Sequence, residues 1–120
     1  MIAAGRSTLR AALDRALTAA GFEVTAQCAT AHAAVRAVTR DRPDVCVVDS
    51  QLPGGALVAA AAIALPPSPP AVLVIDPEGS EASLRAAELA GASGYLRGEL
   101  DENRLTDAIA ALSEQRETRS

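Results

Sequence analysis

A buried-strand pattern that ends in an aspartate is the strongest constraint in this chain. The segment DVCVVDSQLPGG contains an uninterrupted apolar run at residues 45–48, followed at once by Asp49 and a loop rich in Pro and Gly. Such a run is typical of a strand buried on both faces of a parallel sheet. The carboxyl ends of these strands share one edge of the sheet, where open α/β folds bind their ligands. Asp49 is therefore the residue around which other functional side chains are expected to gather.

The composition is that of one folded domain. The chain has 120 residues, of which 49% are hydrophobic and only 2% are aromatic. This length supports a single hydrophobic core, and the hydrophobic content excludes a disordered chain. With so few aromatic residues, the core must consist mainly of Ala, Val, Leu and Ile.

The charge pattern argues against nucleic-acid and membrane binding. The formal net charge is -4 and the Arg residues are scattered, so we expect no direct nucleic-acid contact by this chain. No segment approaches about 18 consecutive apolar residues, and the start lacks the cationic-then-apolar pattern of a signal peptide. We expect a cytoplasmic protein in which Cys28 and Cys46 are buried, unpaired thiols.

Short apolar runs alternate with Ala-rich segments of helical periodicity. Strands are expected at residues 1–4, 22–26, 45–49, 71–76 and 93–96. Helices are expected at residues 7–20, 32–39, 56–65, 80–90, and from 100 or 101 to about 115. Ser7, Thr30 and Ser80 are the candidate N-caps. We expect residues 1–114 to form the domain and residues 115–120 to be a polar tail or the start of a linker to an output domain.

Five strands alternating with five helices predict an α/β fold. The natural arrangement is a flavodoxin-like (βα)5 three-layer sandwich, with a five-stranded parallel sheet in the order 2-1-3-4-5. The first and third strands are then neighbours. The loop near Ala4 and Gly5 consequently shares a cleft with the loop after Asp49.

Three stretches resemble the receiver domain of two-component response regulators. They are AALDRALTAAGFEVTAQCAT, RPDVCVVDSQLPGG and LRAAELAGASGYLRGEL, and they lie in the family's order across nearly the whole chain. The similarity is greatest to receivers attached to a LuxR/NarL-like helix-turn-helix output domain. The resemblance implies a phosphoacceptor aspartate, an acidic pair that helps to hold Mg²⁺, and a Thr or Ser and a Lys that contact the phosphoryl oxygens.

By this resemblance, only the phosphoacceptor position is intact, at Asp49. The acidic pair falls on Ala4 and Gly5, the Thr or Ser position on Asp76, and the Lys position on Gly98. These four positions are degenerate, so we expect Mg²⁺ binding to be weak or absent and predict no other metal site or cofactor. Two carboxylates in one pocket would also repel a phosphoryl donor.

Two further positions keep more than one interpretation. Tyr95 matches the family's switch aromatic, but with no Thr partner we interpret it as core or interface packing. Asp76 is a metal ligand, a stand-in for phosphate charge, or a turn former before Pro77. Arg97 lies next to the lost Lys position, but adjacent strand residues point to opposite faces.

The sequence therefore predicts an atypical receiver domain, a pseudo-receiver with no enzymatic activity of its own. It would serve a bacterial transcription regulator by forming a homodimer or docking a sensor kinase or another protein, with inefficient phosphorylation of Asp49. The family commonly pairs through its fourth helix, fifth strand and fifth helix, or through its first and fifth helices. Two alternatives stay open: a working phosphoacceptor that uses Asp49 with a divalent ion, and a small-molecule sensor that uses the vacated cleft.

Overall fold

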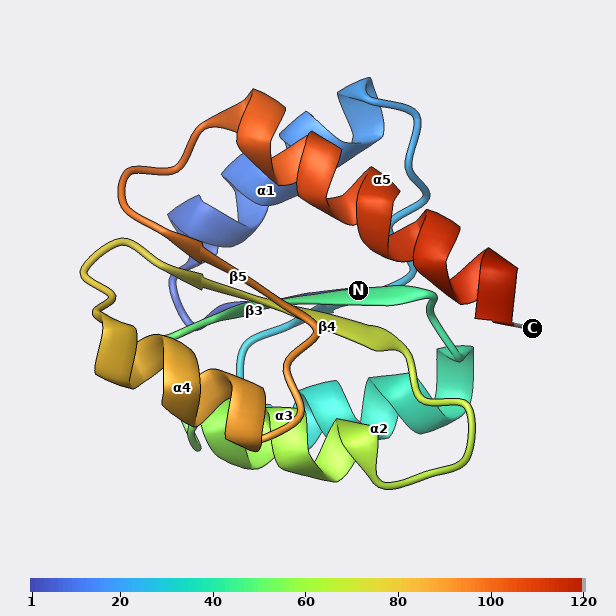
Figure 1. Cartoon of the computed structure of the whole chain (residues 1–120). Helices are drawn as coiled ribbons and strands as arrows, with labels where there is room; N and C mark the ends of the chain where they lie inside the picture. Colours follow the sequence, from blue (N-terminus) through green and yellow to red (C-terminus); the bar gives the residue numbers. More distant parts are fainter. Residues whose placement is uncertain (120) are drawn as a thin grey trace.

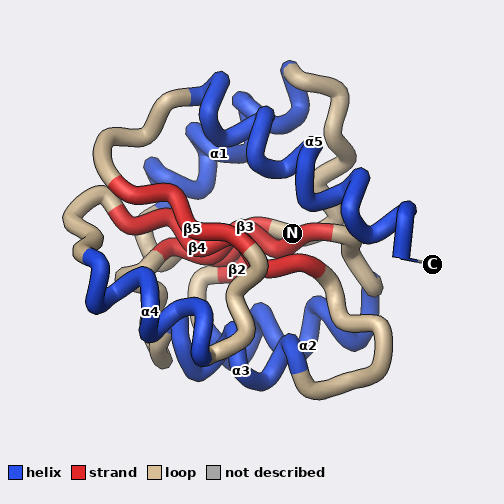
Figure 2. The backbone as a smooth tube through the Cα atoms, viewed as in Figure 1, coloured by secondary structure: helices blue, strands red, loops and turns tan. Residues whose placement is uncertain are grey.

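One parallel sheet lies between two layers of helices in the computed structural model, which describes residues 1–119 (Figure 1; Figure 2). The strand order is β2-β1-β3-β4-β5, and all paired strands are parallel. The strands are β1 (Ile2–Ala3), β2 (Gln27–Cys28), β3 (Val45–Asp49), β4 (Ala71–Asp76) and β5 (Gly94–Arg97). The helices are α1 (Ser7–Ala19), α2 (Ala31–Asp41), α3 (Ala56–Ala64), α4 (Glu81–Leu89) and α5 (Glu102–Arg119). The predicted flavodoxin-like fold and strand order are confirmed.

The two faces of the sheet carry separate halves of the core. α1 and α5 cover one face, and α2, α3 and α4 cover the other (Figure 2). Successive residues of β3 alternate between them: Val45 and Val47 pack with α1 and α5, whereas Cys46 and Val48 pack against the opposite layer. This two-sided burial is the reason that the β3 sequence is apolar at every position before Asp49.

The second strand lies later in the chain than the sequence indicated. The alternating pattern at residues 22–26 predicted a strand there, but only Gln27–Cys28 forms the ladder with β1. Because β1 itself has two residues, it offers few partners. Phe22 and Val24 instead pack as half-buried side chains against the core on the α1 and α5 side.

The helix starts confirm two of the three predicted caps. Thr30 accepts a hydrogen bond from the backbone N–H of Ala33 at 3.1 Å, and Ser80 accepts one from that of Ser83 at 3.1 Å. Ser7 is not a cap, because it is already the first helical residue and Arg6 precedes the helix without a capping side-chain bond.

The last helix extends further than expected. α5 continues through Arg119 instead of ending near residue 115, and Ser120 lies outside the described residues. Arg116 ties this end of the helix to the domain, since its Nη1 lies 3.0 Å from Oδ1 of Asp44. This contact joins residues far apart in the chain, so local sequence could not reveal it.

The cysteines and the membrane-spanning potential of the helices can also be compared with the sequence predictions. Cys28 and Cys46 are buried and unpaired, as predicted. Among residues 1–119, no helix combines the length and the apolar character needed to cross a membrane.

Candidate functional site

A cleft of about 600 Å³ opens at the carboxyl edge of the sheet. It is formed by the loops that follow β1, β3 and β4. Its lining residues are Gly5, Arg6, Asp49, Ser50, Gln51, Pro53, Asp76, Pro77 and Glu78. The fold therefore brings Gly5, Asp49 and Asp76 together as the strand order predicted, whereas Ala4 and Gly98 do not line the cleft.

Asp49 is the most deeply buried acidic residue of this cleft. It ends β3 and is only 1% exposed. Its Oδ1 atom is buried and accepts no hydrogen bond from any described residue. A buried carboxylate oxygen without a donor is unfavourable, so a donor or cation that reached this atom would stabilise Asp49.

Asp76 uses both of its oxygens within the domain. Its Oδ2 accepts a 2.6 Å hydrogen bond from the Tyr95 hydroxyl, and its Oδ1 accepts a 3.2 Å bond from the Ser50 hydroxyl. The carboxylate thus links the end of β4 to β5 and to the first residue after β3. Asp76 supplies the hydrogen-bond partner for Tyr95 that sequence reasoning had regarded as lost.

The surroundings of Tyr95 keep its hydroxyl protonated and in place. Burial, followed by the hydrogen bond to Asp76 and the negative charge of that carboxylate, raises the pKa of Tyr95 to about 12. Gly79 makes room for the ring, because a Cβ atom at this position would collide with the Tyr95 hydroxyl. Tyr95 is half-buried, and its bond to Asp76 holds it next to a residue that lines the cleft.

The loop after β1 has no acidic side chain and little free space. Ala4 is fully buried. A Cβ atom at Gly5 would lie 2.6 Å from Cδ of Pro53, so the proline ring occupies the volume that a side chain at Gly5 would need. Nη1 of Arg10 donates to the carbonyl oxygens of Ala4 and Gly5, at 2.7 Å and 3.1 Å.

The Lys position of the family has neither a cation nor an ordinary backbone conformation. Gly98 has φ +92°, and an added Cβ would approach only Nη1 of Arg104, at 4.0 Å. The neighbouring Arg97 is exposed and does not line the cleft. The sequence has no lysine at any position.

Arg6 is the cation of this cleft that sequence reasoning missed. It is an exposed residue that lines the cleft together with Asp49 and Glu78. The available signal was its place directly after Gly5, in the loop that the strand order puts at this edge.

The side chains present do not form a good magnesium site. Mg²⁺ requires near-octahedral oxygen ligands, commonly including one or two carboxylates with free oxygens. Here both oxygens of Asp76 already accept hydrogen bonds, and Ala4 and Gly5 have no side-chain oxygen. Within residues 1–119, no three His, Cys, Asp or Glu side chains cluster closely enough to hold a metal ion.

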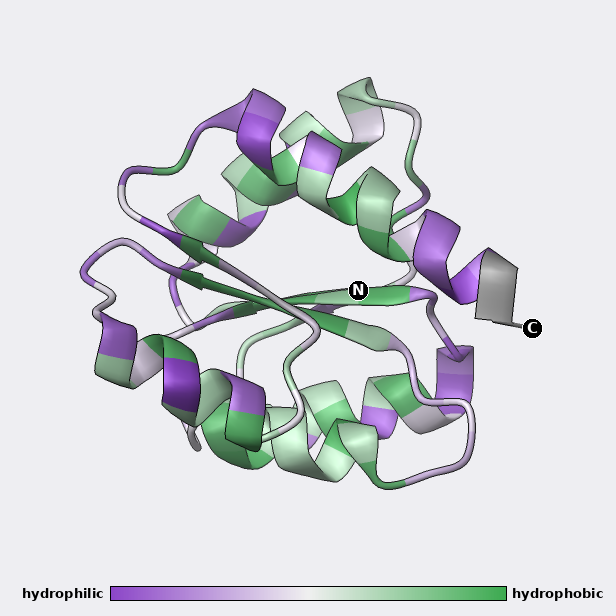
Figure 3. Cartoon of the chain, in the orientation of Figure 1, coloured by the Kyte–Doolittle hydropathy of each residue, from purple (hydrophilic) through white to green (hydrophobic). Residues whose placement is uncertain are grey.

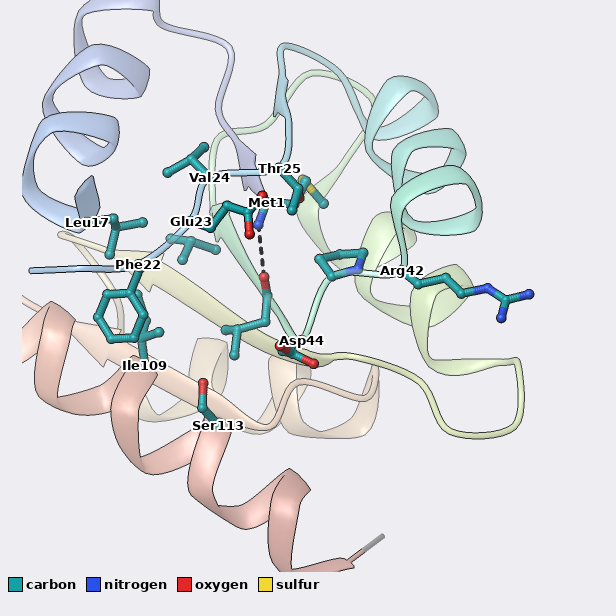
Figure 4. A pocket seen from close by; sticks show the side chains of 13 residues that line it. Met1, Leu17, Phe22, Glu23, Val24, Thr25, Arg42, Asp44, Ile109 and Ser113 are labelled. Atoms are coloured by element: carbon teal, nitrogen blue, oxygen red, sulfur yellow. Dashed lines mark hydrogen bonds between the residues drawn. The ribbon is translucent and has the colours of Figure 1, made fainter.

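A second cavity, of about 320 Å³, lies at the opposite edge of the sheet (Figure 4). Leu17, Phe22 and Ile109 line it, and the Met1 amino group donates a 3.0 Å hydrogen bond to the carbonyl oxygen of Val45 there. Burial lowers the pKa of this amino group. The cavity contains none of the predicted site residues, so it has no part in the chemistry of the Asp49 cleft.

A family model described as the response regulator receiver domain matches residues 1–110. The chain belongs to this family. The receiver domain matches no curated protein sequence.

Solved structures show the same fold. A two-component response regulator of the LuxR family from Aurantimonas sp. SI85-9A1 is 29% identical, with a TM-score of 0.89 over 96% of this receiver domain and 84% of that chain. A DNA-binding response regulator of the LuxR family from Staphylococcus aureus is 21% identical, with a TM-score of 0.85 over 93% and 95% of the two chains. A CheY-like receiver domain protein from Methanospirillum hungatei JF-1 is 18% identical, with a TM-score of 0.88 over 99% and 95%.

Proposed function

We propose that this receiver domain is a regulatory module that works by associating with a second copy or another protein, largely without phosphorylation of Asp49. It is a cytoplasmic, non-enzymatic part of a bacterial transcription regulator and acts on a DNA-binding domain. The likeness to LuxR-family response regulators, one of them a DNA-binding protein, supports this role.

The hydrogen bond between Tyr95 and Asp76 is the observation that carries the proposal. By the resemblance, position 76 belongs to a Thr or Ser that contacts the phosphoryl group, and position 95 to an aromatic residue that responds to it. Here the carboxylate at position 76 itself accepts a 2.6 Å hydrogen bond from the Tyr95 hydroxyl. An aromatic ring held in this way cannot report on phosphorylation as strongly as a free one, which favours a fixed conformation.

The charges in the cleft also disfavour phosphoryl transfer. Asp49, Asp76 and Glu78 face a single Arg6 among the lining residues. A phosphoryl donor brings further negative charge, and its transfer is normally stabilised by a metal ion and fixed cations. We infer that Mg²⁺ binds weakly and that Asp49 is phosphorylated slowly or not at all.

Phosphorylation of the intact protein tests the proposal. The receiver domain is incubated with Mg²⁺ and a small acyl phosphate, and its intact mass is measured over time. A receiver domain that keeps the acidic pair and the Lys serves as a parallel control for the donor. We expect the control to gain a phosphoryl group while this protein stays unmodified. A stoichiometric adduct that disappears in Asp49→Asn would contradict the proposal.

A second candidate function is small-molecule binding in the same cleft. The unpartnered Oδ1 of Asp49 favours it, because a ligand N–H or ammonium group would supply the missing donor. A thermal-shift screen of amines and amino acids tests this function. A ligand at 100 times its dissociation constant would stabilise the fold by about 2.7 kcal/mol, and loss of that shift in Asp49→Asn would locate the site.

A further inference from the structure

α3 differs from the other helices in having no polar side chain. Its nine residues are all Ala, Leu, Val or Ile. In Figure 3 it is green along its length, whereas α4 and α5 carry purple bands. A helix that is apolar all round is normally buried on all sides, yet one side of α3 faces solvent.

The exposed residues of α3 form one continuous stripe. Leu57 is 43% exposed, Val58 is 65% exposed, and Leu65, directly after the last helical residue, is 83% exposed. Ala61 lies between them and is also exposed. Positions 57, 58, 61 and 65 follow the spacing of one helix face, while the opposite face packs into the core through Ala56, Ala59, Ala60 and Ile63.

The end of α4 lies beside α3 and carries a further exposed leucine. Leu89, the last residue of α4, is 90% exposed. The chain passes close to α3 two residues later, where a Cβ on Gly91 would lie 2.8 Å from that of Ala64. We call Leu57, Val58, Ala61, Leu65 and Leu89 the α3 patch. It contains four of the five large hydrophobic residues exposed in the described part of the chain.

We propose that the α3 patch is the surface on which a second copy of this chain docks. The inference rests on the proposed function, since it specifies the association through which the receiver domain would act. α3 offers no charged group to attract a charged partner and none that would lose hydration on burial. Another apolar surface is therefore the best match, and a second copy supplies one through two-fold symmetry.

The area of the patch fits a weak homodimer. Its four large side chains and Ala61 present on the order of 500 Å² of apolar surface, so a symmetric pair would bury at most about 1,000 Å², near the lower limit of a specific interface. Ala61 lies midway between Leu57 and Leu65 in the sequence. Its small side chain allows the two α3 helices to approach closely, with the two-fold axis near this residue.

The surfaces that the family commonly uses are less suitable here. The large apolar residues of α5, Leu105, Ile109 and Leu112, are all buried. Much of the rest of this helix is polar, including Glu102, Asp107 and Glu114. The helix also carries Arg104 and Arg116. Pairing through α5 would therefore bury charged side chains of both signs, and the cores of interfaces are depleted of charged residues.

Sedimentation equilibrium between about 1 and 100 µM, the range of a weak interface, tests the proposal with two matched variants. Val58→Glu places a charge in the α3 patch, and Ala110→Glu places the same charge on the exposed side of α5. We expect a dimer whose dissociation constant rises at least about tenfold in Val58→Glu and is unchanged in Ala110→Glu. Circular dichroism is used to check that both variants fold.

Cysteine crosslinking provides a second measurement that does not depend on a destabilising charge. Under mild oxidation, Ala61→Cys should form a covalent dimer across the two-fold axis, whereas Ala110→Cys should not. The native cysteines are buried. A wild-type chain that stays monomeric at 100 µM, or a dimer broken by Ala110→Glu and not by Val58→Glu, would overturn the proposal.

Vesicle co-sedimentation tests whether the α3 patch binds a lipid surface instead of a second copy. If the monomer binds phosphatidylcholine vesicles and Val58→Glu abolishes that binding without any dimer in the wild type, the patch serves a lipid surface and the proposal fails.

The phosphorylation assay is independent of these results. A phosphorylated dimer would refute the proposed function alone, and an unphosphorylated monomer would refute only the α3 interface.

Discussion

The hydroxyl of Tyr95 donates a 2.6 Å hydrogen bond to Oδ2 of Asp76, and this bond connects the ends of β4 and β5 beside the Asp49 cleft. Ser50 extends the connection to β3 through the other oxygen of the same carboxylate. Residues from β4, β5 and the loop after β3 therefore meet at one carboxylate. Asp76, which stands where the family has a Thr or Ser, therefore fixes the positions of Ser50 and Tyr95 at the carboxyl edge of the sheet.

The titration of Tyr95 should report this bond directly. The unfolded chain releases its tyrosine proton near pH 10, whereas the folded chain keeps it until about pH 12. The folded state binds more protons in this interval, so the contribution of Tyr95 to stability is complete below about pH 10 and is lost as the pH rises to about 12. Near-ultraviolet absorbance measures the ionisation of this residue alone, because the chain has one Tyr and no Trp.

Two variants show whether Asp76 is responsible. Asp76→Ala removes both the hydrogen bond and the charge, so the pKa of Tyr95 should fall toward its ordinary value. Ser50→Ala removes only the second bond to Asp76, and the titration of Tyr95 should change little. Equal titration curves for the wild type and Asp76→Ala would show that the carboxylate does not control Tyr95.

Restoring an acid after β1 should destabilise the fold. In Gly5→Asp the new Cβ would press on the Pro53 ring, and overpacking of this kind costs about 1–3 kcal/mol. The double variant Gly5→Asp/Pro53→Ala should recover part of the loss, because it removes the ring atoms that collide. Urea unfolding of the two variants and of Pro53→Ala measures the coupling. Strictly additive effects would mean that the Gly5–Pro53 contact is unimportant.

Restoring the lysine should be tolerated sterically but strained in the backbone. Only Arg104 lies near the space that a side chain at Gly98 would enter, and the φ of +92° is unfavourable for any residue except glycine. Gly98→Lys should lose about 1–2 kcal/mol of stability and should not by itself restore phosphorylation. Urea unfolding and intact mass after acyl phosphate treatment check the two parts. Gly98→Ala, which bears the same backbone cost, is the control.

Both native thiols should be unreactive in the folded protein. Burial raises the pKa of the Cys28 thiol and raises that of Cys46 to about 12, so neither supplies appreciable thiolate at pH 8. A chromogenic disulfide reagent should label both residues rapidly in denaturant and slowly without it. Rapid labelling of native Cys46 at pH 8 would indicate that β3 opens frequently.

The sequence was most informative where local pattern and tertiary position agree. The limits of β3 and β4 were predicted without error because each strand is buried on both faces. β2 was misplaced because residues 22–26 alternate like a strand, while the short β1 offers them no ladder. The last turns of α5 were missed because their polar composition conceals the contact between Arg116 and Asp44.

The cleft was predictable as a set of positions but not as a set of contacts. Strand order alone brings Gly5, Asp49 and Asp76 to one edge of the sheet. Whether Asp76 meets Tyr95 depends on the path of the β4–α4 loop over Gly79. The exclusion of a side chain at Gly5 depends likewise on the position of Pro53, which no pattern in the sequence encodes.

Pro53 is also held from its other side, since its carbonyl oxygen accepts a 2.8 Å hydrogen bond from the backbone N–H of Ala31, the first residue of α2. The ring cannot withdraw from Gly5 unless this bond between the β3–α3 loop and α2 is broken. Placing an acidic side chain at position 5 by a single substitution is therefore obstructed, because it would push on Pro53 and strain the bond to the first residue of α2. Restoring the site in the laboratory requires the loop to be redesigned before the ligands are replaced.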